Sequence, residues 1–476
     1  MAQKDENVRQ VTKRGGGQGS RGDQDQPAEI EVSITIHEEA STREERLNKL
    51  REEAPVQAEK VKPKIQKVPF MLRVRQDTKF DKYYEPIVAA LGPFHHARKP
   101  QYEYAEKIKL KLAANFVKDS KQNDADLLKK VEDNINELRK CYDEEATKEY
   151  DDEFLAWMLF VDGCSTLEFI YKYDELENFQ IKRDQVAFAE QDMFLLENQL
   201  PYQLLKLLMS TSQIHKELKE SIDEFVGRNS PAAAPADQKR QNSEEEEEQR
   251  SQPGQDVEAE PTHLLELLRT TMLRSPNNKS EIKEGTQRSH SFRNVQELQA
   301  SGIHFKPSEG NSLRSIYFGS YHRFHGILHL PQIKVDDSTR PKFMNLIAYE
   351  MCPDFHNDFG VTSYICFLDS LIDQPDDVKH LRKKLILQNF LGNDEEVALL
   401  FNEIGTDLVP NNNIYSSVKD KIEDHYDNWG NRVMAQFFHE HFSSPWTGIA
   451  FLAALVALGS SIVQTVYSVL GYHNNK

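Results

Sequence analysis

A stretch near the C-terminus, Phe442–Tyr472, contains no Asp, Glu, Lys or Arg. Its apolar part, Ile449–Leu470, has 22 residues, and a bilayer core of about 30 Å is crossed by roughly 20 helical residues. Trp446 and Tyr467 lie toward its two ends, where amphipathic rings favour the headgroup level. We therefore predict one C-terminal transmembrane helix over 449–470. The alternative is a central helix of a soluble bundle, but such helices seldom stay uncharged for so long.

The N-terminal region has no apolar segment of the kind found in secretory signal peptides, because Met1–Gln26 is charged and rich in Gly and Gln. The simplest expected topology is tail-anchored and single-pass, with the bulk facing the cytosol and Lys476 on the far side. Charges before the span are few and of mixed sign, so the positive-inside rule does not decide the orientation. The sequence does not identify the membrane.

Small and polar residues recur along the predicted span at spacings of four and three. They are Ala450, Ala454, Ala457, Ser461, Gln464 and Ser468. On a helix this spacing places them on one face, where small side chains let two backbones approach and a Gln adds an interhelical hydrogen bond. We predict self-association or pairing with another membrane helix along this stripe. The alternative is an ordinary anchor whose alanines are incidental.

The chain is acidic, with a formal net charge of −18. Binding of nucleic acid requires a basic face, so we expect no nucleic-acid partner; the expected partners are the lipid bilayer and an unknown protein. Four cysteines lie far apart without CxxC spacing. This favours buried thiols over a zinc site and leaves one disulfide open.

Composition and periodicity divide the rest of the chain into five ranges. They are a disordered tail (1–28), an extended segment with a charged helix (29–64), a helical region (65–226), a disordered acidic linker (227–261) and a region of helices and short strands (262–442). The run Glu244–Glu248 in the linker either recruits a basic partner or belongs to a spacer. The predicted fold class is α+β, predominantly α-helical, with a small antiparallel β element and a C-terminal transmembrane helix.

Individual elements follow from the local patterns. Glu153–Tyr173 is predicted to be an interior helix, because its acidic residues argue against a second span. Asp192–Met209 is predicted to be a helix, a break at Pro201 and a second helix. Extended stretches are expected at IHFKP, SIYFGSYHRFHGILHL and QIKVDD. A helix is expected over DDVKHLRKKLILQNFL, with Asp376 and Asp394 as N-caps of this helix and the next.

Histidines are the residues that most invite an enzyme hypothesis: His95, His96, His322, His325, His329, His439 and His441. A zinc site of this kind usually needs a helical HExxH and a third ligand, and no HExxH occurs in the sequence. The GxSxG elbow, the P-loop and a GxGxxG after a strand are absent too. We predict no catalytic residue, no cofactor and no metal.

Several blocks appear in a characteristic order. They are VPFMLR (Val68–Arg73), YYEPIVAALGPFHH (Tyr83–His96), an acidic-aromatic run ending VDGCSTLEF, LLENQLP (Leu195–Pro201), ELQASGIHFK, LPQIKVDDSTRPKFMNLIAYE (Leu330–Glu350), VTSYICFLDSLID and SPWTGIAFLAAL. Together they resemble the plant-specific family known as domain of unknown function 247, over about 65–470. Phe94 stands where members commonly have Tyr.

The resemblance implies a globular region that ends in a single transmembrane helix, and it brings no catalytic assignment. Grass members encoded at the two self-incompatibility loci are regarded as pollen-side determinants. The resemblance therefore implies recognition or signalling by protein–protein contact, with pollen self-incompatibility as one specific role. The alternative is a membrane-attached, hydrolase-like enzyme, which convergent His and carboxylate side chains in one cleft would favour.

Polar residues inside these blocks are the candidate site residues: His95, His96, Glu197, Asn198, Gln199, Asp336, Asp337, Asn345 and Glu350. Where apolar neighbours bury them, they need hydrogen-bond partners. They form either a structural network that ties helix ends together or a ligand pocket. The lack of a nearby nucleophile or phosphate cradle favours the network. His95 and His96 follow a Gly92-Pro93 turn between predicted helical stretches and are expected to cap or pair locally.

Overall fold

The computed structural model describes residues 47, 62–75, 80–96, 100–231, 260–274, 293–321, 325–427 and 445–474. The predicted disordered tail (1–28), most of the segment 29–64 and most of the predicted acidic linker lie outside these residues. His322, His439 and His441 lie outside them as well.

Helix α8 (Asp152–Tyr171) is the central helix of the N-terminal half of the described chain. It is apolar on every side, as is typical of a helix buried all round, and it packs against α4, α5, α10 and α11. The prediction of an interior helix is confirmed, because 83% of its most apolar window is buried. The other elements of this half are α2 (Phe70–Arg75), α3 (Phe80–Tyr84), η1 (Pro100–Tyr102), α4 (Glu103–Ser120), α5 (Asp124–Asp133), α6 (Ile135–Lys140), α7 (Glu144–Thr147), η2 (Tyr173–Phe179), α9 (Arg183–Asp192), η3 (Leu196–Asn198), α10 (Tyr202–Met209) and α11 (His215–Asn229).

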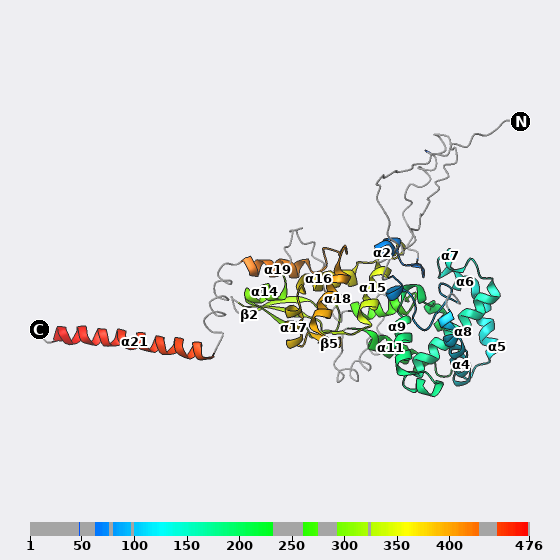
Figure 1. Ribbon diagram of the computed structural model, residues 1–476, viewed down its shortest axis with the longest axis horizontal. Coiled ribbons are helices and arrows are strands. Elements are labelled where there is room, and N and C mark those ends of the chain that lie inside the picture. The colour runs from blue at the N-terminus through cyan, green and yellow to red at the C-terminus, as the bar shows by residue number, and fades with distance from the viewer. Residues whose placement is uncertain are drawn as a thin grey trace, which may run out of the picture. The chain divides into compact units, whose positions relative to one another are not determined.

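The C-terminal half combines helices with two small sheets (Figure 1). Its elements are α13 (Leu264–Leu273), α14 (Val295–Ala300), β1 (Ile303–Pro307), β2 (Tyr317–Tyr321), β3 (His325–Leu330), β4 (Ile333–Val335), α15 (Thr339–Glu350), α16 (Gly360–Leu371), α17 (Pro375–Lys383), β5 (Leu387–Asn389), α18 (Asp394–Gly405) and α19 (Ser416–Asp427). The predicted α+β class is confirmed. The sheet β1-β3-β2 is mixed: β2 and β3 are antiparallel, as expected, whereas β1 runs parallel to β3. Strands β4 and β5 form a second, parallel pair.

Two local predictions are wrong. The helix expected over DDVKHLRKKLILQNFL ends at Lys383, because Leu385 adopts a positive φ of 60° and Leu387–Asn389 pair with β4 instead. The predicted N-caps are displaced by one or two positions. Gln374 caps α17 and Asn393 caps α18, so Asp376 and Asp394 lie in the first turns, where their charges favour the helix dipole.

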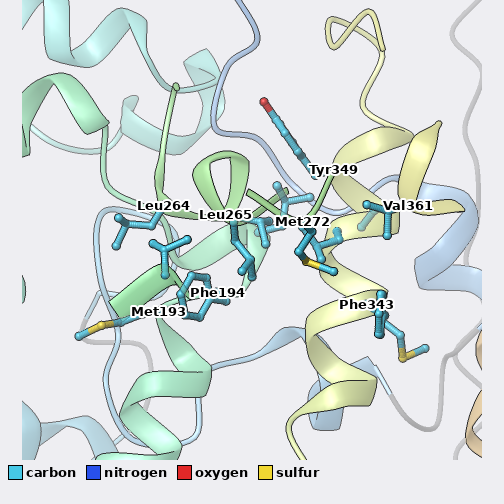
Figure 2. Packing of buried hydrophobic residues seen from close by; sticks show 14 of the residues in the cluster. Met193, Phe194, Leu264, Leu265, Met272, Phe343, Tyr349 and Val361 are labelled. Carbon is cyan, nitrogen blue, oxygen red and sulfur yellow. The ribbon is translucent and has the colours of Figure 1, made fainter. Parts of the chain in front are cut away.

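The two halves share one hydrophobic core. Figure 2 shows Met193 and Phe194 from the N-terminal half beside Leu264, Leu265 and Met272 of α13, with residues of α15 and α16 farther along. The boundary between the halves differs from the predicted linker. Helix α11 extends to Asn229, and the carbonyl of Pro231 accepts a hydrogen bond of 2.8 Å from the amide of Lys334.

Helix α21 (Pro445–Asn474) contains the predicted C-terminal apolar helix. Within it, 449–468 is long and apolar enough to cross a membrane, and none of this window is buried. The core helix α8 passes the same test of length and composition, but it is buried. Exposure of the apolar window 449–468 is what a membrane helix requires and what a soluble core helix avoids.

Candidate functional site

The YYEPIVAALGPFHH block leaves helix α3 at Tyr84 and continues as an irregular segment to His96. The helical stretches predicted around Gly92-Pro93 are therefore wrong. The predicted turn is present: Gly92 has φ of +64°, and a Cβ there would lie 3.0 Å from the Tyr142 hydroxyl and 3.2 Å from the Gln199 carbonyl. Only glycine fits such a position without strain. An irregular segment needs other partners for its backbone groups, and buried polar side chains supply them.

The Asp192 carboxylate, at the end of α9, is the first of these partners. It accepts hydrogen bonds from the amides of Ile87 (2.8 Å), Val88 (2.7 Å) and Ala89 (2.9 Å). Burial raises the pKa of Asp192 to about 6, because its effect is larger than that of the three backbone hydrogen bonds, which lower the pKa. The carboxylate thus fixes three consecutive residues of the irregular segment.

Asn198, a predicted site residue, holds the next part of the segment. Its Oδ1 accepts from the Leu91 amide at 2.7 Å, and its Nδ2 donates to the carbonyls of Ala89 and Asp192, both at 2.9 Å. The side chain is fully buried. All of its hydrogen bonds go to backbone groups, as expected of a structural residue rather than of a ligand contact.

Gln199 is buried and ties the two halves of the chain together. Its Nε2 donates to the carbonyls of Met193 (2.7 Å) and Leu195 (2.8 Å), and its Oε1 accepts from the amide of Leu265 on α13 at 3.1 Å. These contacts explain why the stretch before Pro201 is a short η3 turn and not the predicted helix. The carbonyls of Asp192, Met193 and Leu195 accept hydrogen bonds from side chains, whereas in a helix they would accept from backbone amides.

Asp162 and Lys109 form a buried ion pair that the sequence interpretation missed. Lys109 Nζ lies 2.5 Å from Asp162 Oδ1 and donates to the Ala90 carbonyl at 2.9 Å, while Asp162 Oδ2 accepts from the Gly92 amide at 2.8 Å. Burial lowers the pKa of Lys109, but the carboxylates of Asp162 and Glu106 outweigh this and leave the pKa raised. Lys109 therefore keeps its charge, and the pair anchors the turn at Gly92.

Glu197 lies at the centre of a third contact group. One carboxylate oxygen accepts from the Val68 amide at 2.7 Å and from the Arg73 guanidinium, and the other lies 3.6 Å from His95 Nε2. His95 therefore lies beside a residue of the LLENQLP block that is distant in sequence. His96 packs edge-on against Phe154, with ring centroids 5.5 Å apart.

Asn345 on α15 connects these blocks to the C-terminal half. Its Oδ1 accepts from the Leu196 amide, and its Nδ2 donates to the carbonyls of Tyr83 and Pro341, each at 2.8 Å. The predicted site residues Glu197, Asn198, Gln199 and Asn345 are thus brought together with His95 in one buried network.

Glu350 belongs to a separate group at the start of α16. It accepts from the amides of Val361 (3.0 Å) and Thr362 (2.8 Å), and Arg269 donates to it at 2.8 Å. Arg269 also pairs with Asp358 at 3.1 Å. A carboxylate on the first amides of a helix satisfies donors that have no partner inside the helix.

Asp336 and Asp337 do not join either group. Asp336 accepts from the Ser338 amide at 3.1 Å and from the Ser338 hydroxyl at 2.6 Å, before α15 begins. Burial alone would raise the pKa of the Asp336 carboxyl. The hydrogen bond from the Ser338 hydroxyl and the charges of Lys342 and Lys334 have a larger, opposite effect, so the pKa lies below its usual value. Asp337 is exposed.

The described histidines lie in several different surroundings, and two of them are neighbours: burial and nearby positive charges, His304 among them, lower the pKa of His380. Apart from His95 and His96, His263 accepts from the Glu266 amide and stacks edge-on with Tyr349, His329 stacks on Tyr317, His380 contacts Phe305 and His425 contacts Phe318. Within the described ranges no group of three or more His, Cys, Asp and Glu side chains could hold a metal ion. All four cysteines are free thiols, so the disulfide left open by the sequence is not formed.

The missed network residues had a recognisable signal. Lys109 falls on the apolar stripe of α4, with Ala105, Leu112 and Phe116 at helical spacing. Asp162 is an acid in the middle of the long apolar helix α8. A charge on an otherwise buried face predicts a buried partner, but the sequence does not say which residue that partner is.

An exposed surface over α7 and the start of α8 combines acidic and aromatic side chains; we call it the acidic–aromatic surface. Its exposed members are Glu144, Glu145, Lys148, Glu149, Asp151, Asp152, Glu153, Phe154 and Trp157. Six are acidic and one is basic. Phe154 is 43% exposed and Trp157 47% exposed. Two of the acids form ion pairs, Glu145 with Lys67 and Asp152 with Arg139.

The predicted stripe on the C-terminal helix lies on one continuous helix, α21, as its spacing requires. Ala450, Ala454, Ala457, Ser461, Gln464 and Ser468 are all exposed. From Ala450 to Ser468 a helix rises about 27 Å, close to the thickness of a bilayer core. The association of this face with another helix stays a prediction.

These features define a class of protein: a helix-rich globular region built around buried polar side chains, followed by one apolar C-terminal helix. The model of the family described as "Plant protein of unknown function", domain of unknown function 247, matches residues 65–459. The chain therefore belongs to this plant family, and the resemblance read from its sequence blocks is confirmed.

Two relatives in Arabidopsis thaliana are similar to this chain. UPF0481 protein At3g47200 is 26% identical over 436 residues, which cover 83% of this chain and 84% of the relative. A second UPF0481 protein, At3g02645, is 26% identical over 166 residues, 34% of this chain and 30% of that relative. No solved structure matches the chain.

Proposed function

We propose that the protein is anchored in a membrane by α21 and acts by recognising a protein partner that presents basic side chains around an apolar group. The observation that carries this proposal is the acidic–aromatic surface, with six exposed acids and the exposed rings of Phe154 and Trp157. Phe154 and Trp157 are three residues apart on α8 and so lie on one side of the helix. Apolar groups rimmed by polar residues mark interaction sites, and Trp is enriched among the residues that contribute most to interface affinity.

The charge of the surface supports a basic partner. Exposed acids of one sign attract a partner of the opposite sign during diffusional encounter and exclude partners of like charge. Burial of Phe154 and Trp157 then supplies affinity, because aromatic rings offer a large apolar area at a low cost in conformational entropy. In this proposal the acidic side chains determine which partner binds, and the aromatic rings provide most of the binding affinity.

Helix α2 carries further exposed apolar side chains, close in sequence to a residue that contacts this surface. Phe70 is 76% exposed and Met71 73% exposed on this short helix. Lys67, three residues before Phe70, pairs with Glu145 at 3.2 Å, so the start of α2 borders α7. The exposed side chains of the VPFMLR block thus lie at the edge of the acidic–aromatic surface.

The buried polar residues support recognition over the hydrolase alternative. Asp192, Asn198 and Gln199 direct their hydrogen bonds to backbone groups, which is a structural use of polar side chains. His95 lies beside Glu197 in the N-terminal half, whereas His329 stacks on Tyr317 in the β1-β3-β2 sheet, so these two histidines do not share a site.

Membrane attachment is part of the proposal. The exposed apolar window 449–468 supports it, and the expected topology is tail-anchored with the globular region in the cytosol. Protease treatment of intact vesicles tests this orientation: cleavage of the globular region without detergent is expected, and its full protection contradicts a cytosolic location. A role in pollen self-incompatibility is a narrower prediction, tested by expression in pollen and by allele-specific rejection of that pollen on the stigma.

Site-specific photo-crosslinking tests the recognition surface. The full chain, expressed in plant membranes, carries benzoylphenylalanine in place of Trp157. The matched control carries it in place of Phe188, which is similarly exposed on α9 at 44%. A discrete crosslinked protein is expected from position 157 alone, with lower yield in Glu149→Lys and Glu153→Lys variants. Equal yields from both positions, or a yield unaffected by the lysine substitutions, contradict the proposal.

A further inference from the structure

A cavity of about 60 Å³ lies between α4, α8, α9 and the irregular segment held by Asp192 and Asn198. Its lining is nearly all apolar, with Leu91, Ile108, Leu112, Phe169 and Met193 among its walls. The cavity is not fully enclosed. Tyr104 and Gln185 belong to its lining, and Tyr104 is 48% exposed, so these residues mark its mouth.

One buried polar atom in this lining has no hydrogen-bond partner among the described residues. Thr166 on α8 is 2% exposed, and its hydroxyl oxygen makes no hydrogen bond with any residue that the structure describes. A helical threonine commonly bonds the carbonyl four residues earlier, but here Ser165 donates to that carbonyl, of Asp162, at 3.1 Å. A buried hydroxyl without a partner is costly and calls for an explanation.

Lys109, the charged residue of the lining, is fully engaged. Its ammonium contacts the Ala90 carbonyl and the carboxylates of Asp162 and Glu106. A ligand would therefore meet the apolar stem of Lys109 and not its charge. Thr166 is buried in the lining, and its hydroxyl has no partner among the described residues, which makes the cavity suited to an uncharged molecule with one polar atom.

We propose that this cavity is a binding site for a small uncharged amphiphile, whose apolar end occupies the cavity and whose single oxygen hydrogen-bonds to Thr166. The volume sets the size of the buried end. One water-sized atom takes up roughly 10–15 Å³ of cavity volume. A cavity of about 60 Å³ therefore holds about four or five heavy atoms. Ala105 and Ala189 in the lining provide this space, because larger side chains there would fill it.

The site is distinct from the acidic–aromatic surface and does not depend on the proposed recognition function. Its wall does depend on the buried network, because Val88, Ala89 and Leu91 line the cavity and are held by Asp192 and Asn198. Occupation of the cavity would therefore stabilise the irregular segment of the YYEPIVAALGPFHH block.

The test uses the full chain in lipid nanodiscs with ¹³C-methyl-labelled methionine, and 3-methyl-1-butanol as the probe. Met193 lines the cavity, whereas Met272 is buried in the core by α13 and serves as the internal control. A saturable shift of the Met193 methyl resonance is expected, with Met272 unmoved. The polar control molecule, 1,4-butanediol, is expected to leave both resonances unchanged.

Two variants separate the site from non-specific partitioning into lipid. Ala189→Leu fills the cavity and is expected to abolish the saturable shift. Thr166→Val removes the hydroxyl without changing the size of the side chain, and one lost hydrogen bond is expected to weaken binding of the alcohol by about 2- to 10-fold. An unmoved Met272 resonance in both variants reports an intact fold. A Met193 shift that persists in Ala189→Leu, an unchanged Kd in Thr166→Val, or no saturable shift in the wild type overturns the proposal.

Discussion

Substitution of Asn198 by alanine tests how much stability the buried network supplies. The side chain makes three hydrogen bonds, to the Leu91 amide and to the carbonyls of Ala89 and Asp192, all at 2.7–2.9 Å. A typical intramolecular hydrogen bond contributes about 1 kcal/mol, and a buried donor left without a partner costs about 1–3 kcal/mol. Asn198→Ala is therefore expected to lower the free energy of unfolding by about 3 kcal/mol or more.

A loss of this size is large for a single substitution, because domains are stable by only about 5–15 kcal/mol. Asn402→Ala is the matched control, since Asn402 makes one exposed hydrogen bond of 3.3 Å to the Asp373 carbonyl. This control is expected to change stability by at most about 0.5 kcal/mol. Asn198→Asp keeps the acceptor for Leu91 but loses both donors, so it is expected to fall close to the alanine variant.

Pulse proteolysis in urea, applied to the full chain in nanodiscs, measures these differences as shifts in the unfolding midpoint. The expected order of stability is wild type, Asn402→Ala, then Asn198→Ala well below both. If Asn198→Ala unfolds at the same urea concentration as Asn402→Ala, the network does not stabilise the fold and its polar residues need another explanation.

Three further predictions concern pH and the C-terminal helix. Burial raises the pKa of Glu168 to about 7 from an ordinary value of 4.5. The folded chain therefore binds the proton of the Glu168 carboxyl more tightly than the unfolded chain does. As a result, the free energy of unfolding decreases as the pH rises from about 4.5 to 7. Glu168→Gln keeps the 2.5 Å contact with Asn115 and is expected to be more stable than the wild type by about 1–3 kcal/mol at pH 8 and no more stable at pH 4 in urea unfolding; equal pH profiles contradict this. Deletion of 446–476 is expected to move the protein into the soluble fraction after carbonate extraction, and a truncated chain that still pellets with membranes refutes the anchor. Gln464→Leu is expected to reduce crosslinking between copies of α21, or between α21 and a partner helix, by up to about tenfold. If Gln464→Leu has no effect and a bulky substitution at Leu455 reduces the crosslinking, the interface lies on another face of the helix.

Much of the fold could be predicted from patterns in the sequence. The charge-free stretch at Ile449 gives the C-terminal helix, and the apolar run with few acids at Asp152–Tyr171 gives the buried helix α8. Both depend on local composition, which directly reports the environment of a helix. The block order gave the family, which the family model confirms.

The irregular segment could not be predicted, because its conformation depends on distant residues. Asp192 lies more than 100 positions along the chain from the amides of Ile87 and Val88, and Asn198 from that of Leu91. The strand β5 has the same cause: Leu387–Asn389 pair with β4, more than 50 positions earlier, within a stretch whose local pattern favours a helix. Sequence patterns identified polar residues that needed partners, but not the partners.

Amide hydrogen exchange of the irregular segment tests the central claim most directly. In the full chain in nanodiscs, the amides of Leu91 and Gly92, bonded to Asn198 and Asp162, are expected to exchange at rates within about tenfold of those in the middle of α8. Their protection is expected to fall in Asn198→Ala. Exchange of Leu91 and Gly92 as fast as that of an exposed loop in the wild type contradicts the claim that buried polar side chains hold this segment in place.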